Sequence, residues 1–242
     1  MSHRRPVLLA RLVALAVSIL AVSACSMGPP TRLYVLTPLP RAESVPPAAG
    51  RRELSIGVGP VELPQYHNRS QIVTGQHSSE LRSAASAQWA EPLQDGFTRV
   101  LAENLSLLLA TERVALFPWK TFAPEYQIVV EVTHFLGQTG GEVSLVALWS
   151  ILNKDGREAL VSKKSSFRES TGSSEYEALA AAMSRTVAAL SRDIATALLA
   201  EYRKFKSIFA PFPPPPGHAV LPARAAPPAR CGRPAGAARS KV

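Results

Sequence analysis

The chain has 242 residues, 46% of them hydrophobic, and a formal net charge of +9. This length can bury one full hydrophobic core but hardly two, so we expect a single folded domain. The positive charge is concentrated at the two ends: three arginines precede residue 12, and five basic residues but no acidic one follow Ala210. Without these ends the chain carries only about +1, which excludes the electrostatic footprint of a nucleic-acid-binding domain.

Residues 1–24 have the pattern of a lipoprotein signal peptide. The N-terminal arginines are followed by the apolar run LVALAVSILAV, which is shorter than the roughly 20 residues that a membrane-spanning helix needs. The run ends in Val22-Ser23-Ala24-Cys25, with an aliphatic residue three positions before the cysteine and small residues next to it. This is the bacterial lipobox pattern, so we predict cleavage before Cys25 and lipidation of its thiol. An ordinary signal peptide with an incidental cysteine is the alternative.

Lipidation of Cys25 predicts that acyl chains hold the mature protein at a membrane, because each buried methylene group contributes about 0.8 kcal/mol. The residue after the cysteine is Ser26 rather than an aspartate, which favours the periplasmic face of the outer membrane. The other cysteine, Cys231, has no second partner in the chain once Cys25 is acylated. We therefore expect no intrachain disulfide.

Composition divides the mature chain into three parts. Residues 25–50 are predicted to be the lipidated N-terminus and a Pro- and Ala-rich spacer, although residues 32–37 (RLYVLT) have the composition of a short strand. Residues 51–207 contain regularly spaced apolar residues and are predicted to form the folded domain. Residues 208–242 lack such spacing and are predicted to be a disordered, basic, Pro- and Ala-rich tail.

The first half of the domain contains one strong strand and one strong helix signal. Alternating apolar residues predict a strand within 53–63, and short strands or irregular connections follow up to about residue 84. Residues 88–111 (QWAEPLQDGFTRVLAENLSLLLAT) place Trp89, Leu93 and Phe97 at helical spacing, with Pro92 tolerated early in the helix. This pattern predicts an amphipathic helix with one buried stripe.

The second half of the domain is predicted to be a β-meander closed by a helix. A brief strand at 113–118 precedes longer strands within 125–137, 142–153 and 157–170, and the Asn153-Lys154-Asp155-Gly156 loop is a strong hairpin signal. Residues 173–204 predict a long amphipathic helix that begins at a capping box formed by Ser174 and Glu177. The predicted fold is therefore α+β: a mainly antiparallel sheet with two long amphipathic helices packed on one face, in a single domain.

Motifs that carry enzyme chemistry are missing from the sequence. The histidines between leader and tail are His67, His77 and His134, and none has metal-ligand spacing with a cysteine or a second histidine. The chain contains no G-x-S-x-G, H-E-x-x-H or phosphate-loop motif. We therefore expect a protein that is not an enzyme, with no cofactor and no metal site.

Three short motifs resemble a known family. They are V-x-L-P-x-Y at 61–66, Arg69-x-Gln71-Ile72-Val73, and Trp89-Ala90-Glu91-Pro92-Leu93. In order and spacing they resemble the PqiC-type lipoproteins, the ABC-transporter auxiliary family associated with mammalian-cell-entry (MCE) lipid transport. The resemblance extends from about Tyr34 to Tyr202. This sequence departs from the family pattern where Asn68 and Ser70 replace an aspartate and a proline beside Arg69.

The resemblance implies an outer-membrane-anchored subunit that docks onto the periplasmic tunnel of an MCE-domain protein and, through it, works with an inner-membrane subunit. A homo-oligomeric ring would suit the extension of a tunnel. The resemblance also implies an interface, for which the candidate residues are Tyr66, Arg69, Gln71, Trp89 and Glu91. Alternatively, the aromatic pair packs the first helix onto the sheet while Arg69 and Gln71 satisfy local backbone groups.

Two other functional classes remain open at the sequence level. An envelope lipoprotein that binds the cell wall or a secretion complex would share the anchor and the spacer. A lipid-carrying periplasmic protein would differ by holding phospholipid in a cavity of its own, whereas the apolar stripes here have the spacing of an ordinary core.

Overall fold

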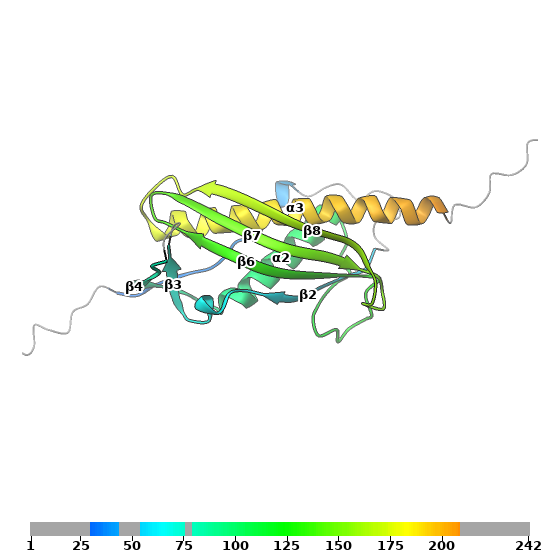
Figure 1. Ribbon diagram of the computed structural model, residues 1–242, viewed down its shortest axis with the longest axis horizontal. Helices are drawn as coiled ribbons and strands as arrows, with labels where there is room; N and C mark the ends of the chain where they lie inside the picture. The colour runs from blue at the N-terminus through cyan, green and yellow to red at the C-terminus, as the bar shows by residue number, and fades with distance from the viewer. Residues whose placement is uncertain (1–29, 44–53, 76–78, 209–242) are drawn as a thin grey trace, which may run out of the picture.

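The computed structural model describes residues 30–43, 54–75 and 79–208 (Figure 1). Cys25, His77 and Cys231 lie outside this part of the chain. The predictions about the signal peptide, the lipidation site and the basic tail therefore lie outside the described residues as well.

The larger of two sheets has five strands in the order β5-β2-β6-β7-β8. Its strands are β2 (Ile56–Glu62), β5 (Val114–Leu116), β6 (Tyr126–Gly137), β7 (Glu142–Leu152) and β8 (Ala159–Ser170). The predicted meander is present, since β7 is antiparallel to both β6 and β8 along their lengths. Strand β2 instead runs parallel to β5 and β6. The sheet is mixed because a helical crossover, rather than a hairpin, separates β2 from these two neighbours in the chain.

A smaller, three-stranded sheet lies at one end of the molecule. Its order is β1-β4-β3, with β1 (Arg32–Tyr34) parallel and β3 (Gln71–Thr74) antiparallel to β4 (Arg82–Trp89). Two single-turn 3₁₀ helices, η2 (Arg41–Glu43) and η4 (Gln65–His67), connect these segments to the rest of the fold. The short strand expected near the spacer is thus β1, the edge of this smaller sheet.

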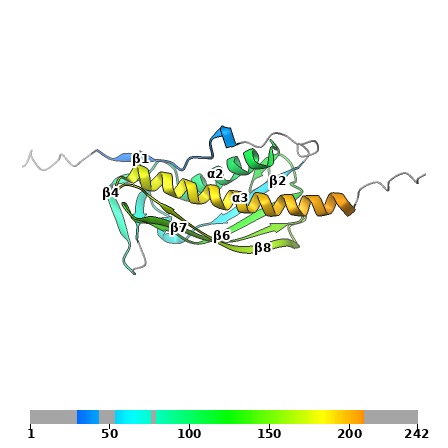
Figure 2. The same ribbon diagram turned by 90° about the horizontal axis from the view of Figure 1, so that it is seen from above.

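Two helices, α2 (Leu93–Leu109) and α3 (Tyr176–Ile208), cover the same face of the large sheet (Figure 2). Their apolar stripes meet the inward-facing residues of the strands, and the rings of Phe97 on α2 and Phe135 on β6 pack edge to face with centroids 5.5 Å apart. This arrangement confirms the predicted α+β class and the placement of both helices on one face.

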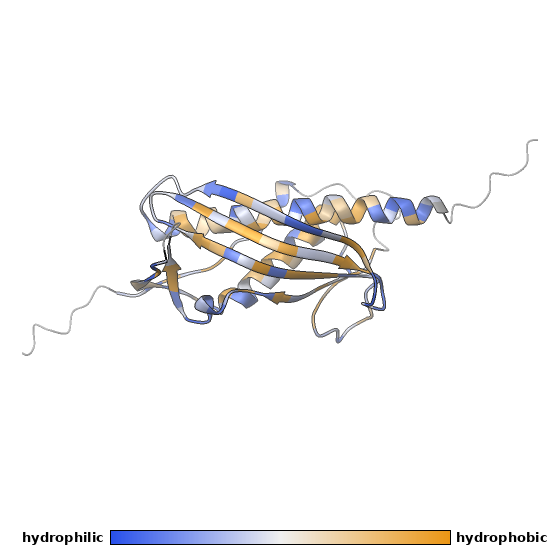
Figure 3. Cartoon of the chain, in the orientation of Figure 1, coloured by the Kyte–Doolittle hydropathy of each residue, from blue (hydrophilic) through white to orange (hydrophobic). Residues whose placement is uncertain are grey.

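The hydropathy of the residues follows this layered arrangement of helices on a sheet (Figure 3). Polar and apolar residues alternate along β6 and β7, and α3 becomes hydrophilic toward its C-terminal end, where Arg203, Lys204 and Lys206 are exposed. The predicted hairpin turn is present as well, since Gly156 has a φ of +67° and donates its N–H to the carbonyl of Asn153. Within the described residues, no helix is long and apolar enough to cross a membrane.

Both helices begin differently from the sequence prediction. Trp89 is the last residue of β4 and pairs with Tyr34 of β1, while Pro92 is the N-cap, with φ −51° and ψ 129°, rather than a helical residue. At α3 the hydroxyl that accepts a backbone N–H belongs to Ser173, whose partner is Glu175 at 3.3 Å. The wrong start of α2 arises because Trp89 fits the helical spacing while a distant strand decides its conformation.

Candidate functional site

The motif segments come together around one groove. The end of β2, the turn η4 and the connection between β4 and α2 enclose a volume of about 770 Å³. Its lining residues come from 62–70 and from 89–94, among them Leu63, His67, Arg69, Trp89, Glu91 and Gln94. We call this feature the motif groove. Of the five predicted interface residues it contains Arg69, Trp89 and Glu91.

Trp89 belongs to the structural base of the motif groove. Its side chain is 5% exposed and is part of the main hydrophobic core. Its backbone N–H donates to the carbonyl of Ser70 at 2.7 Å, and the next N–H, of Ala90, donates to the carbonyl of Tyr34 at 2.8 Å. The position of Trp89 therefore joins the segment before β3 to the end of β4 and to β1.

Arg69 is the exposed cation of the motif groove. Its side chain donates from Nη1 to the hydroxyl of Ser83 at 3.2 Å, and its backbone N–H donates to the carbonyl of His67 at 2.7 Å. This side-chain hydrogen bond lies at the surface and uses one of the five N–H donors of the exposed guanidinium. Among the predicted residues, Arg69 is the one best placed to meet a partner.

Tyr66 and Gln71 do not line the motif groove. The Tyr66 ring is half-buried and packs against the His67 ring with centroids 4.6 Å apart, and this burial raises the pKa of the Tyr66 hydroxyl. Gln71 is half-buried at the start of β3, where it pairs with Gln88 of β4.

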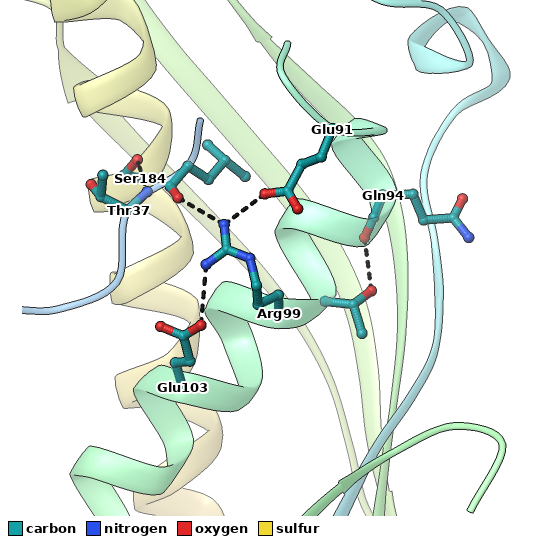
Figure 4. A network of polar contacts seen from close by, with 8 residues as sticks. Thr37, Glu91, Gln94, Arg99, Glu103 and Ser184 are labelled. Carbon is teal, nitrogen blue, oxygen red and sulfur yellow. Dashed lines mark hydrogen bonds and ion pairs between the residues drawn. The ribbon is translucent and has the colours of Figure 1, made fainter. Parts of the chain in front are cut away.

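Glu91 forms an ion pair within the chain (Figure 4). Arg99 of α2 extends between two carboxylates, with Nη2 2.6 Å from Glu91 Oε1 and Nη1 3.1 Å from Glu103 Oε1. The same Nη2 donates to the carbonyl of Leu36 at 3.2 Å. The two carboxylates, with the Glu91 hydrogen bond foremost, raise the pKa of Arg99. The structure thus gives Glu91 a role in holding the residue 34–39 segment against α2.

Arg99 was not among the predicted site residues. The sequence contains one signal for it, the Arg99–Glu103 pair at i,i+4 spacing, which is common on exposed helices. Its second carboxylate, Glu91, lies eight residues earlier and before the helix begins, so helical spacing does not indicate the contact. A side chain on Gly96 would lie 3.0 Å from Glu91 Oε1, so the glycine leaves room for this carboxylate.

His67 is buried in the wall of the motif groove. It is 6% exposed, and its Nε2 lies 2.7 Å from the carbonyl oxygen of Phe135, to which the protonated nitrogen donates. Desolvation lowers the pKa of His67 to about 4, against a smaller opposing effect of that hydrogen bond. The imidazole is therefore neutral at pH 7 and links the turn η4 to β6. With Nε2 committed to a carbonyl, this residue is poorly placed for proton transfer.

The described residues contain no group of three His, Cys, Asp or Glu side chains that could hold a metal ion. The motif groove offers an exposed guanidinium, a buried aromatic base, the carboxylates of Glu62 and Glu91, and several backbone and amide groups. This chemistry suits binding of a polypeptide segment, because arginine and aromatic residues dominate the energetics of such contacts.

Residues 34–195 match the family model described as an ABC-type transport auxiliary lipoprotein component. Protein XCC0632 from Xanthomonas campestris is similar in structure, with a TM-score of 0.59, 16% identity, and 73% of this chain and 99% of that chain covered. An uncharacterized protein of known crystal structure gives a TM-score of 0.57 at 18% identity, covering 70% and 99%. At these identities the similarity shows the fold. No curated protein matches this chain.

Proposed function

We propose, since the chain belongs to the ABC-type transport auxiliary lipoprotein family, that it is the outer-membrane-anchored periplasmic subunit of an MCE-type intermembrane lipid transport system. In this role it would dock onto the tunnel protein that reaches across the periplasm, and the tunnel protein would connect it to the inner-membrane subunit. The family gives the lipoprotein character and the association with an ABC-type transporter, and the finer assignment is our proposal.

The observation that carries the proposal is the motif groove. Residues of all three motifs that resemble the PqiC-type signature line the same groove, although about 20 residues of the chain separate the third motif from the first two. Within it, Trp89 and His67 are fixed by the core and Arg69 is exposed. A rigid base with one exposed guanidinium suits a docking site for a tunnel protein, because preorganised groups lose little freedom on binding.

The anchor and the assembly complete the proposal. Cys25 would carry the acyl chains, and Ser26 after it favours the outer membrane. Several copies would form a ring around the end of the tunnel, since head-to-tail contacts close into rings. The role would be binding rather than catalysis, and the engagement of His67 by a backbone carbonyl supports this reading.

The test is an affinity purification of the lipidated protein from its own membranes after cross-linking, with identification of partners by mass spectrometry. We expect an MCE-domain protein together with a multi-pass membrane subunit. A parallel purification of the Arg69→Glu variant should recover less of both. Recovery of only cell-wall or secretion proteins would contradict the proposal, and stoichiometric phospholipid without a tunnel protein would indicate a lipid carrier instead.

A further inference from the structure

The segment Thr31–Leu39, which we call the strap, is held along its length by the rest of the fold. The N–H of Thr37 donates to Ser184 Oγ at 3.1 Å, and the N–H of Leu39 donates to Asn104 Oδ1 at 2.7 Å. The carbonyl of Leu36 accepts from Arg99, as described above. The strap is therefore a fixed part of the domain surface and not a loose continuation of the spacer.

Side chains alternate along the strap, but both faces are apolar. Leu36 is 2% exposed and Tyr34 is half-buried against Tyr176 of α3, with ring centroids 6.4 Å apart. Leu33 and Val35, which point the other way, are 64% and 45% exposed. The outward face of an edge strand is usually polar or charged, because exposed apolar edges promote association. The exposed side chains of Leu33 and Val35 therefore indicate contact with a partner surface.

The position of the strap in the chain indicates what that surface is. Only five residues lead from Cys25 to Pro30, and an extended chain of that length spans at most about 18 Å. With the acyl chains of Cys25 in the bilayer, the strap would therefore begin within about 18 Å of the anchor. Arg32, next to the two apolar side chains, is exposed and carries the charge that anionic headgroups attract.

We infer that Leu33 and Val35, with the exposed Arg32 beside them, form a membrane-contact face that seats the domain in the phospholipid headgroup region beside its anchor. A hollow of about 610 Å³ between the strap and the first turns of α3, lined by Tyr34, Ala180 and the carboxylate-bearing Glu177 among others, adjoins this face. The inference rests on the anchor at Cys25 that belongs to the proposed function. It adds an orientation, which a flexible tether alone would not define.

The membrane-contact face lies near one end of α3, so the two ends of the helix lie at different distances from this face. The N-terminal end of α3 lies beside β1, and the helix runs along the long axis to the opposite end of the described fold (Figures 1 and 2). Its 33 residues span about 50 Å at 1.5 Å per residue. Thr31, on the outward side of the strap, and Ser207, near the end of α3, are both exposed and give a matched pair of probe positions.

The experiment uses the full lipidated chain with Cys231→Ser, in vesicles of phosphatidylethanolamine and phosphatidylglycerol that contain a nitroxide-labelled phospholipid. A fluorophore is attached to Thr31→Cys or, separately, to Ser207→Cys. We expect nitroxide quenching at position 31 and none at position 207. Replacement of Leu33 and Val35 by serine should lower the quenching at position 31 by at least about twofold. Leu148→Ser, which changes an exposed leucine on the open face of the sheet, should leave it unchanged.

The possible outcomes distinguish a failure of the membrane-contact face from a failure of the anchor. The chain could float with vesicles while the double serine variant shows the same quenching at position 31 as the original. That result would overturn the membrane-contact face and leave the anchor intact. Efficient disulfide dimers of Thr31→Cys, with position 31 shielded from lipid, would overturn it in favour of a contact between two copies. A chain that fails to float with vesicles would overturn the anchor itself and, with it, both proposals.

Discussion

The strap and strand β8 both lie against the helical layer, but they are held by different kinds of contact. The strap is fastened by Asn104, a fully buried side chain that accepts from the N–H of Leu39 and donates to Ser191 Oγ at 3.1 Å. Strand β8 is fastened by ion pairs at the surface, such as Lys163 with Asp193 at 2.6 Å. The difference shows which polar contacts matter most for stability. Loss of one partner of a buried polar group lowers the free energy of unfolding more than loss of an exposed ion pair, because water can replace the exposed contact.

The largest effect is expected for Asn104→Ala. The change removes the acceptor of the Leu39 N–H and the donor to Ser191, and it leaves a cavity between α2 and α3. We expect the free energy of unfolding to fall by about 3 kcal/mol in urea titrations. Gln94→Ala, at an exposed position of the same helix, should cost less than about 0.5 kcal/mol. A loss below about 1 kcal/mol for Asn104→Ala would mean that the buried contact is not decisive.

The next effect concerns pH and His67, the buried polar group of the motif groove. The pKa of His67 is about 4 in the folded state, below the ordinary value of 6.5, so the unfolded chain binds the proton more tightly. Stability from this group is fully present above pH 6.5 and is lost as the pH falls toward 4. The loss should reach about 3 kcal/mol near pH 4, since each unit of pKa difference corresponds to 1.36 kcal/mol.

Comparison with His67→Gln isolates this contribution, because carboxylates also titrate in the same range. Urea titrations at pH 7, 6, 5 and 4 should show a steeper decline for the natural protein than for the variant. Glutamine retains an N–H donor for the carbonyl of Phe135 and has no charge to gain. Parallel pH profiles for the two proteins would show that protonation of His67 does not act on folding.

A smaller effect is expected where β8 meets α3. Asp193 accepts from Lys163 and from the hydroxyl of Ser165, and the Lys163 side chain is half-exposed. Asp193→Asn removes the charge and preserves an acceptor, so we expect a loss of at most about 1 kcal/mol. The difference should shrink further in about 1 M salt, where the Debye length is near 3 Å. A loss as large as that of Asn104→Ala would erase the contrast between the two regions.

The same contrast explains how far the sequence could predict the fold. The β6–β7–β8 meander and both helices were predictable because their residues pair with neighbours in the chain, through turns or helical spacing. The parallel pairings of β2 and the strand conformation of Trp89 were not, because distant segments decide them. In the site, the motifs indicated Arg69, Trp89 and Glu91 together. The ion pair between Glu91 and Arg99 could not be predicted, since it joins a loop to a helix.

The smallest effect on stability, and the most informative one for function, is expected for Arg69→Glu. Its side chain makes one surface hydrogen bond, to Ser83, so the melting temperature should stay nearly unchanged. Association with the tunnel protein should nevertheless weaken, because the charge at position 69 is reversed where a partner would meet it. Co-purification from cross-linked membranes and a thermal melt would measure both properties.

Arg168→Glu is the matched control, since Arg168 is exposed on β8, away from the motif groove. It should change neither the melting temperature nor partner recovery. If Arg69→Glu instead lowered the melting temperature strongly, Arg69 would be a structural residue of the η4 turn. The motif groove would then share the character of the strap, with its motif residues maintaining the fold. If only recovery fell, the buried residues of the groove would be its support and Arg69 its contact with the partner.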